Sequence, residues 1–281
     1  MAKNWTEPAD IALRADGQRV ADLDTASTPG FTGGKRLGKE LLAERATVLS
    51  VLQEKLFAHG RTGGQHSVLL ILQGMDTAGK GGIVRHVIGS VDPQGVDHAS
   101  FGVPTEEESQ HDFLWRIRNK LPAHGQIGVF DRSQYEDVLV VRVHELVPQA
   151  EWEQRYDQIN TFEKAVADAG TTIVKVAMFV SLDEQKRRLR ERLERPDKYW
   201  KFNPSDITER AHWPEYQKAY QAVLDRTNTD YAPWYVLPSD NKWYARLAVT
   251  ELLIAALSRL DLDWPPADFD IAEQLRRLDE S

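Results

Sequence analysis

The sequence contains no cysteine, which excludes a disulfide framework and a thiol nucleophile. Long hydrophobic runs are also absent. The longest, such as 68–72 and 176–180, are far too short to span a bilayer. The first eight residues lack the apolar stretch of a signal peptide. We therefore expect a cytoplasmic protein with no membrane partner.

Positive charge is scarce as well. The chain has 35 Lys and Arg against 43 Asp and Glu, a net charge of −8. This balance argues against bulk binding of nucleic acid, which is not expected as a partner, but it does not exclude a local basic groove. The eight histidines show no metal-ligand spacing. At 41% hydrophobic and 28% charged, the composition is that of a globular domain.

One segment has the spacing of a phosphate-binding loop. Gly74-Met75-Asp76-Thr77-Ala78-Gly79-Lys80-Gly81-Gly82 directly follows the apolar run Ser67–Gln73. The Gly-x4-Gly-Lys spacing bends the backbone so that successive N–H groups point at phosphate oxygens, and the next helix adds its dipole. An ordinary strand-to-helix turn is the less favoured alternative. The expected phosphate-binding residues are Gly74, Ala78, Gly79, Lys80, Gly81 and Gly82.

Two residues of this loop are unusual. Gly81 stands where a Ser or Thr normally reaches Mg²⁺, and Asp76 places an acid inside a site built for anions. A carboxylate there would repel phosphate unless a cation lay between them. We therefore interpret Asp76 as a metal ligand that replaces the missing hydroxyl, with Mg²⁺ as the expected ion and Mn²⁺ as a substitute. The alternative is a helix-capping acid.

A second motif is the apolar strand Ile127–Asp131, which ends in a carboxylate. In nucleotide-binding folds of this type such an Asp stands beside the phosphate loop and helps to hold Mg²⁺. Arg132 follows at once, and its planar fork of donors suits phosphate oxygens. A turn-forming acid at a strand end is the alternative interpretation of Asp131.

A basic segment lies further along the chain. Residues 182–201 contain eight Lys or Arg and five acids. At helical spacing, Arg188, Arg192 and Arg195 share one face, and we expect a second face of leucines to pack, formed by Leu182, Leu189 and Leu193. The alternative is a solvated face on which the arginines pair with neighbouring acids.

The turn after this helix carries Lys198 and Lys201 around an aromatic pair. Phosphoryl transfer needs positive charge that closes over the phosphates and excludes water, so a basic helix and turn suit a lid. Together with Lys80 and Arg85, this lid predicts a path for a long polyanion.

The hydrophobic pattern alternates strand and helix from Ser67 onward, which favours an α/β fold with a mostly parallel sheet covered on both faces. A domain over 37–260 is expected, with an irregular arm at 1–36 and an acidic tail at 261–281. The expected strands are 67–73, 98–103, 126–131, 172–181 and 234–237. The expected helices are 38–58, 80–90, 106–121, 135–145, 151–169, 183–194, 205–227 and 242–260.

Taken together, these motifs resemble the family-2 polyphosphate kinases, which are phosphate-loop kinases. The resemblance runs from about Phe31 to Leu257 and includes Arg188 and Arg192 at the positions of the family's lid arginines. It rests on the loop 74–80 with its internal acid, Val103-Pro104-Thr105-Glu106, Phe130-Asp131-Arg132-Ser133-Gln134-Tyr135 and Lys198-Tyr199-Trp200-Lys201. It implies a parallel five-stranded sheet between helices (three-layer α/β/α), a lid at about 183–215, Mg²⁺ dependence, and homodimers or homotetramers.

Glu136 and the residues after it resemble the subgroup that phosphorylates both AMP and ADP. The resemblance implies reversible transfer of the terminal phosphoryl group of inorganic polyphosphate to an adenine or guanine nucleotide. It assigns metal binding to Asp76 and Asp131, and nucleotide binding to Glu136 with Asp131 and Arg132. Lys80 would hold the phosphates. The charge that develops during transfer would be stabilised by Arg132, Arg188 and Arg192. The polymer would be guided by Arg85, Lys198 and Lys201.

Two other functions remain open from the residues. One is an ATP-dependent nucleoside monophosphate kinase, although a polymer needs more positive contacts than a single triphosphate does. The other is a nucleotide-binding protein without catalysis. Asp76, Asp131 and the lid arginines together argue against it.

Overall fold

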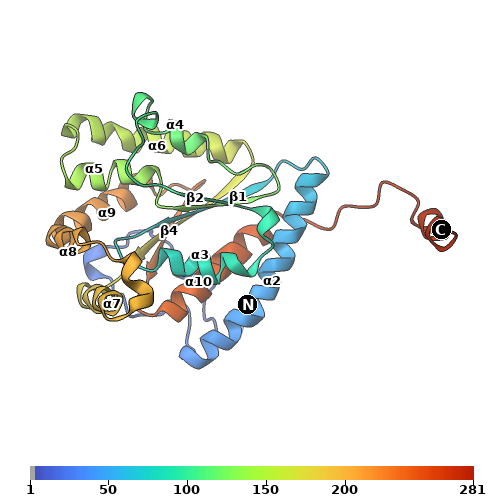
Figure 1. The fold of residues 1–281 in the computed structure, drawn as a ribbon, viewed down its shortest axis with the longest axis horizontal. Coiled ribbons are helices and arrows are strands. Elements are labelled where there is room, and N and C mark those ends of the chain that lie inside the picture. Colours follow the sequence, from blue (N-terminus) through green and yellow to red (C-terminus); the bar gives the residue numbers. More distant parts are fainter. Residues whose placement is uncertain (1–3) are drawn as a thin grey trace.

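The computed structural model describes residues 4–281, and a five-stranded parallel sheet forms its centre (Figure 1). The strand order β2-β3-β1-β4-β5 and the parallel pairing confirm the predicted fold class. The strands are β1 (Ser67–Gln73), β2 (Val96–Ser100), β3 (Ile127–Asp131), β4 (Thr171–Phe179) and β5 (Trp234–Pro238). Each overlaps an expected strand.

Helices cover both faces of the sheet, as the unbroken apolar pattern of β1 requires (Figure 1). Val68, Leu70 and Leu72 point into one core, and Leu69 and Ile71 point into the other. The first core is closed by α2 (Lys35–Arg61), α3 (Lys80–His86) and α10 (Lys242–Arg259). The second is closed by α4 (Trp115–Arg118), α5 (Val140–Val143), α6 (Gln149–Asp168) and α9 (Trp213–Thr227).

The strand register brings the two sequence motifs together. Leu72 on β1 pairs with Asp131 on β3, so the phosphate loop and the second motif leave the sheet side by side at its carboxyl edge. Ligands of open parallel sheets bind at this edge. The fold therefore places segments that are about 50 residues apart in the sequence in a single site.

The single helix predicted over 106–121 is wrong. The segment forms the 3₁₀ turn η4 (Glu108–Gln110) and then the short α4. Thr105 and Glu108 exchange two capping hydrogen bonds, Thr105 N to Glu108 Oε2 at 2.8 Å and Glu108 N to Thr105 Oγ1 at 3.2 Å. Asp112 then accepts from the backbone of Leu114 at 3.1 Å and starts α4. Because these polar side chains bind the backbone locally, they divide the segment.

Three other predicted helices are shorter or divided. The helix at 80–90 ends at His86 and is followed by η2 (Ile88–Ser90), and 135–145 separates into η5 (Gln134–Asp137) and α5. The segment 205–227 separates into α8 (Ser205–Glu209), η7 (Arg210–His212) and α9. Pro214 lies in the first turn of α9, where its missing N–H costs nothing, so a new helix begins there.

An irregular arm is predicted at 1–36; its residues 4–34 are described and are mostly irregular, with α1 (Ala9–Ala12) and η1 (Val20–Asp22), and they pack against the domain. Trp5, Leu13 and Phe31 are buried. Val236 N donates to Leu13 O at 2.8 Å, and Ala15 N donates to Trp234 O at 3.0 Å. The arm therefore covers the open edge of β5, which would otherwise offer unpaired backbone groups to another chain.

The remaining helices are α7 (Leu182–Glu194), η6 (Pro196–Lys201), η3 (Pro93–Gly95) and α11 (Ile271–Asp279). Across residues 4–281, none of the helices combines the length and the apolar character that crossing a lipid bilayer demands.

Candidate active site

A pocket of about 620 Å³ opens at the carboxyl edge of the sheet. It is bounded by the phosphate loop, the ends of β2 and β3, the α7–η6 segment and the start of α10. Three acids line it, namely Asp76, Asp131 and Glu191. Nine basic side chains outnumber them: Lys80, Arg85, Arg132, Arg188, Arg192, Lys198, Lys201, Lys242 and Arg246. A chain with net negative charge thus has a strongly positive pocket suited to a polyanion.

The backbone of the phosphate loop is held in uncommon conformations. Thr77 has a φ of 66°, which is unfavourable for a β-branched residue, and Gly79 has a φ of 118°. A Cβ at Gly74 would lie 2.7 Å from the carbonyl oxygen of Met178, so only glycine fits there. Backbone strain of this kind is found at ligand-binding sites that the surrounding structure holds in place.

Lys80 is largely buried and donates from Nζ to the carbonyl oxygen of Gly74 at 2.5 Å. Burial lowers the pKa of Lys80, and the nearby Asp131 and Asp76 oppose that shift. The ammonium group thus lies across the loop, in position to meet an anion in the pocket.

Asp76 and Arg132 join the first motif to the second. Arg132 Nη2 lies 3.3 Å from Asp76 Oδ1, and both side chains are partly exposed in the pocket. Arg132 has a φ of 66° directly after β3. Burial tends to lower the pKa of Arg132, but Glu136, Asp76 and Asp131 outweigh this and raise it. The guanidinium is therefore firmly cationic.

Two carboxylates in the pocket could hold a divalent ion. Asp76 and Asp131 supply hard oxygen donors, and Mg²⁺ is commonly bound by one or two carboxylates with water and substrate phosphates as its other ligands. Within residues 4–281, no cluster of three or more His, Asp or Glu forms a closed protein cage for a metal. The donor set fits a hard ion that is shared with substrate, and it does not fit a structural zinc site.

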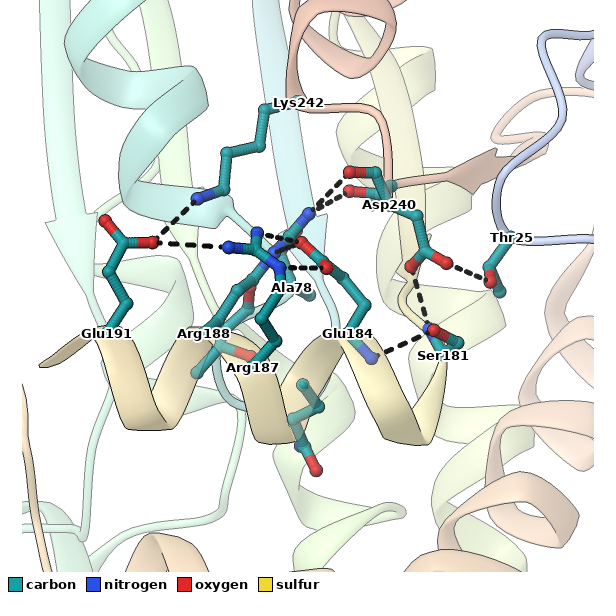
Figure 2. A network of polar contacts seen from close by, with 12 residues as sticks. Thr25, Ala78, Ser181, Glu184, Arg187, Arg188, Glu191, Asp240 and Lys242 are labelled. Atoms are coloured by element: carbon teal, nitrogen blue, oxygen red, sulfur yellow. Dashed lines mark hydrogen bonds and ion pairs between the residues drawn. The ribbon is translucent and has the colours of Figure 1, made fainter.

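The guanidinium of Arg188 is 4% exposed and uses all five of its N–H donors on the protein (Figure 2). Its partners are Glu184 Oε1 at 2.7 Å and the carbonyl oxygens of Thr77 at 2.8 Å, Ala78 at 3.1 Å, Ser239 at 2.6 Å and Asp240 at 3.0 Å. Arg188 therefore connects α7 to the phosphate loop and to the loop after β5.

The expected leucine face of this helix is wrong. Leu182 and Leu193 are 40% and 49% exposed, and only Leu189 of the three is buried. Arg188 and Gln185 are buried beside Leu189. Because the guanidinium satisfies backbone carbonyls of the loops below it, the packed face of α7 is partly polar, which a count of leucines could not predict.

The distal residues of the predicted lid make fewer contacts with the domain. Arg192 Nη1 donates to Lys201 O at 2.9 Å and to Asp206 Oδ2 at 3.0 Å, which links α7 to η6 and α8. Lys198 pairs with Glu191, and Lys242 Nζ lies 4.0 Å from the same carboxylate. Glu191 thus neutralises part of the positive charge around the pocket.

Sequence reasoning missed two cations of the pocket, Lys242 and Arg246. They lie on the first turns of α10, four residues apart. This spacing, which places both side chains on one face of the helix, was the only feature of the local sequence that could have indicated them. Burial, followed by the charge of Arg85, lowers the pKa of Arg246. Burial and the charges of Arg246 and Arg85 likewise lower the pKa of His86. Arg85 and Arg246 therefore form a positive wall, and the lowered pKa of His86 favours the neutral imidazole beside them.

Two predicted residues, Gly74 and Glu136, do not line the pocket, whereas all the others do. Glu136 lies beside it, where its Oε1 accepts a hydrogen bond of 2.9 Å from Gln73 Nε2. Ser133 Oγ donates in turn to Gln73 Oε1 at 3.3 Å. Sequence reasoning missed Gln73 because a polar residue at the end of an apolar strand gives no indication of its partner.

A buried ion pair supports the second motif from behind. Lys175 on β4 and Glu163 on α6 lie 2.6 Å apart, and both are almost fully buried. Tyr135 donates to Glu163 at 2.7 Å, and Gln134 donates to it at 2.9 Å. The turn that carries Arg132 is therefore fixed to the core by the two residues that follow Ser133.

Comparison with known proteins identifies the family of this chain. The family model of polyphosphate kinase 2 matches residues 34–263. An AMP/ADP-polyphosphate phosphotransferase from Meiothermus ruber is 48% identical over 90% of this chain and 94% of its own length. An ADP-polyphosphate phosphotransferase from Rhodopseudomonas palustris is 43% identical over 84% of each chain.

Among solved structures, the crystal structure of polyphosphate kinase 2 from Arthrobacter aurescens superposes with a TM-score of 0.96 at 53% identity. That match covers 99% of this chain and 98% of the other. With a family match over most of its length and relatives above 40% identity, the chain belongs to the polyphosphate kinase 2 family.

Proposed function

We propose that this protein transfers the terminal phosphoryl group of inorganic polyphosphate to AMP, to ADP or to both, reversibly and with Mg²⁺, which Mn²⁺ can replace. The observation that carries the proposal is the pocket in which nine cations surround a phosphate loop. A nucleoside triphosphate alone does not need that many cations. The name of the Meiothermus ruber relative, an AMP/ADP-polyphosphate phosphotransferase, supports the choice of AMP and ADP.

The reaction needs no strong general base, because the attacking phosphate oxygen of the nucleotide is already ionised near neutral pH. Catalysis consists of positioning and charge neutralisation of an in-line, loose transition state. Asp76 and Asp131 would hold the divalent ion, which supplies charge neutralisation between the reacting phosphates. Lys80 and the loop N–H groups would orient the phosphates, and Arg132 would reach the same oxygens from its fixed position on the turn after β3.

The lid residues would take two roles. Arg85, Lys198 and Lys201, which all line the pocket, would guide the polymer, and Arg192 would stabilise the charge that develops during transfer. Arg188 would add its charge to the pocket wall while its N–H groups hold the carbonyls of the phosphate loop. Glu136 would orient the acceptor nucleotide, adenine or guanine, from beside Arg132. A cytoplasmic homodimer or homotetramer is part of the same proposal.

The test is an assay without ATP, in which polyphosphate and Mg²⁺ are mixed with AMP, ADP, GMP or GDP. We expect ADP and ATP to form from the adenine nucleotides. No product from AMP or ADP, together with activity when ATP is the donor, would identify a conventional nucleoside monophosphate kinase instead.

Substitutions in the site separate catalysis from binding. Asp76→Ala and Lys80→Ala should abolish turnover while circular dichroism and thermal unfolding stay close to the parent protein. Unchanged rates in both variants would favour a nucleotide-binding protein in which the pocket does no chemistry.

A further inference from the structure

The segment after α10 lies away from the domain. Figure 1 shows α11 standing apart from the rest of the chain, joined to it by an extended stretch. In the described residues, its one ion pair with the domain is Lys55 to Asp263 at 3.1 Å, where the segment leaves the C-terminal half of α2. The side-chain hydrogen bonds of α11 stay within the segment, as in Arg276 with Glu273 and Glu280.

Among residues 4–281, this helix has one apolar face that is left exposed. Ile271, Leu275 and Leu278 recur at helical spacing and are 58%, 58% and 70% exposed. Phe269 and Trp264 on the connecting stretch are also exposed. An isolated helix of nine residues is not stable in water, and a row of large exposed apolar side chains marks an interaction surface. The helix therefore needs a partner that covers this face.

We propose that α11 docks on a second copy of this chain, so that two copies exchange these segments. The match to the Arthrobacter aurescens crystal structure covers 99% of this chain, so its aligned span extends into this segment. Residues 261–281 hold seven acids and two arginines, a balance that opposes docking on an anionic lipid surface or on nucleic acid. A protein surface with exposed cations fits it.

Such a surface exists on α2. Its first turns expose Lys35 and Lys39 beside Arg36, which pairs with Glu40 at 2.8 Å, and no side chain caps its N-terminus at Gly34. One face of the same helix exposes Ala43, Thr47 and Val51 at a spacing of four residues, which lets another helix approach closely. When two α2 helices pack antiparallel along this face, the segment that leaves the C-terminal half of one helix reaches the basic start of the other.

The segment after α10 is long enough to reach the start of α2 in the second copy. The 27 residues of α2 span about 40 Å, and the extended stretch before α11 covers about 30 Å in addition to the length of α11 itself. The acidic segment of one copy can therefore meet Lys35 and Lys39 of the other. This proposal does not depend on the phosphate chemistry of the pocket.

The test compares two charge-matched variants of the full chain by light scattering coupled to size-exclusion chromatography. Leu275→Glu places a charge on the apolar face, whereas Ala272→Glu adds the same charge about a quarter turn away. We expect Leu275→Glu to raise the dissociation concentration at least tenfold and Ala272→Glu to leave the oligomer unchanged. A monomeric parent protein, or the same oligomer in both variants, would overturn the proposal.

The absence of cysteine allows a direct test of where the segment docks. Asp279→Cys chains mixed with Lys39→Cys chains should form a disulfide-linked pair of copies on mild oxidation. Asp279→Cys mixed with Asp97→Cys, an exposed position on β2, should not. An intact oligomer without the first crosslink would overturn the placement on α2.

Discussion

Gln73, at the end of β1, donates a hydrogen bond of 2.9 Å to Glu136, so the strand that leads into the phosphate loop also positions a residue that follows the second motif. Gln73 is fully buried and accepts from Ser133 as well. It therefore sets the orientation of Glu136 without lining the pocket.

We expect Gln73→Met to lower kcat/KM for the nucleotide acceptor by about 10- to 100-fold, because a hydrogen bond to a charged group contributes about 1.5–3 kcal/mol. The KM for polyphosphate should stay the same. Steady-state kinetics with each substrate varied in turn will measure both. Equal losses toward polyphosphate and nucleotide would point to a general structural defect. Glu136→Gln serves as the matched control at the other end of the bond.

Arg188 gives a prediction about stability. Arg188→Ala leaves four carbonyl oxygens without their donor and removes one of the hydrogen bonds to Glu184, which keeps those from Arg187, so we expect a loss of about 3 kcal/mol or more in the free energy of unfolding. Arg192→Ala removes a more exposed side chain with two acceptors and should cost about 1 kcal/mol. Urea unfolding compares the two variants, and a similar loss in both would contradict the anchoring role of Arg188.

The hydrogen bonds of Glu184, in the first turn of α7, lead to a prediction about the stability of the fold at low pH. Burial would raise its pKa, but hydrogen bonds from Arg187 and Arg188 dominate and lower it to about 2. Because the folded-state pKa is depressed, this group stabilises the fold above about pH 4.5, and that contribution is lost as the pH falls towards 2. The thermal midpoint of Glu184→Gln should lie below that of the parent at pH 7, and the two should converge near pH 2. A constant difference across this range would contradict the linkage.

The buried pair Lys175 and Glu163 should show strong non-additivity. Lys175→Met alone leaves an uncompensated carboxylate in the core and should cost about 3–5 kcal/mol. The double variant Lys175→Met, Glu163→Leu removes both charges and should recover much of that loss. Chemical unfolding of four proteins, the parent, Lys175→Met, Glu163→Leu and the double variant, closes this cycle, and additive losses would show that the pair is not coupled.

The same double variant separates stability from catalysis. Glu163 also accepts hydrogen bonds from Tyr135 and Gln134, which follow the turn of Arg132. A stable double variant with reduced kcat would show that the pair positions this turn. A stable variant with the parent's kcat would limit the pair to a structural role.

The sequence allowed the sheet to be predicted because each strand of a doubly covered parallel sheet is an apolar run, and β1 and β3 both end in functional motifs. The candidate site residues near Lys80 and Asp131 could also be predicted, because glycine spacing and an acid at the end of a strand are visible in the local sequence.

The rest depended on contacts that are distant in the sequence. Lys242 and Arg246 join the pocket only because α10 packs beside α3. Arg188 is buried because carbonyls more than 50 and 100 residues away accept its N–H groups. The prediction of a helix at 106–121 was wrong because of local contacts. Capping by Thr105 and Asp112 overrides the helical tendency of the segment.

The carboxylate of Glu191, between Lys198 and Lys242, acts as a built-in counter-ion. An incoming polyanion has to exchange places with it before those ammonium groups are free. A long chain gains enough phosphate contacts to make that exchange favourable, whereas a single orthophosphate gains few. In the proposed reaction, this exchange would discriminate against small anions and favour polymers.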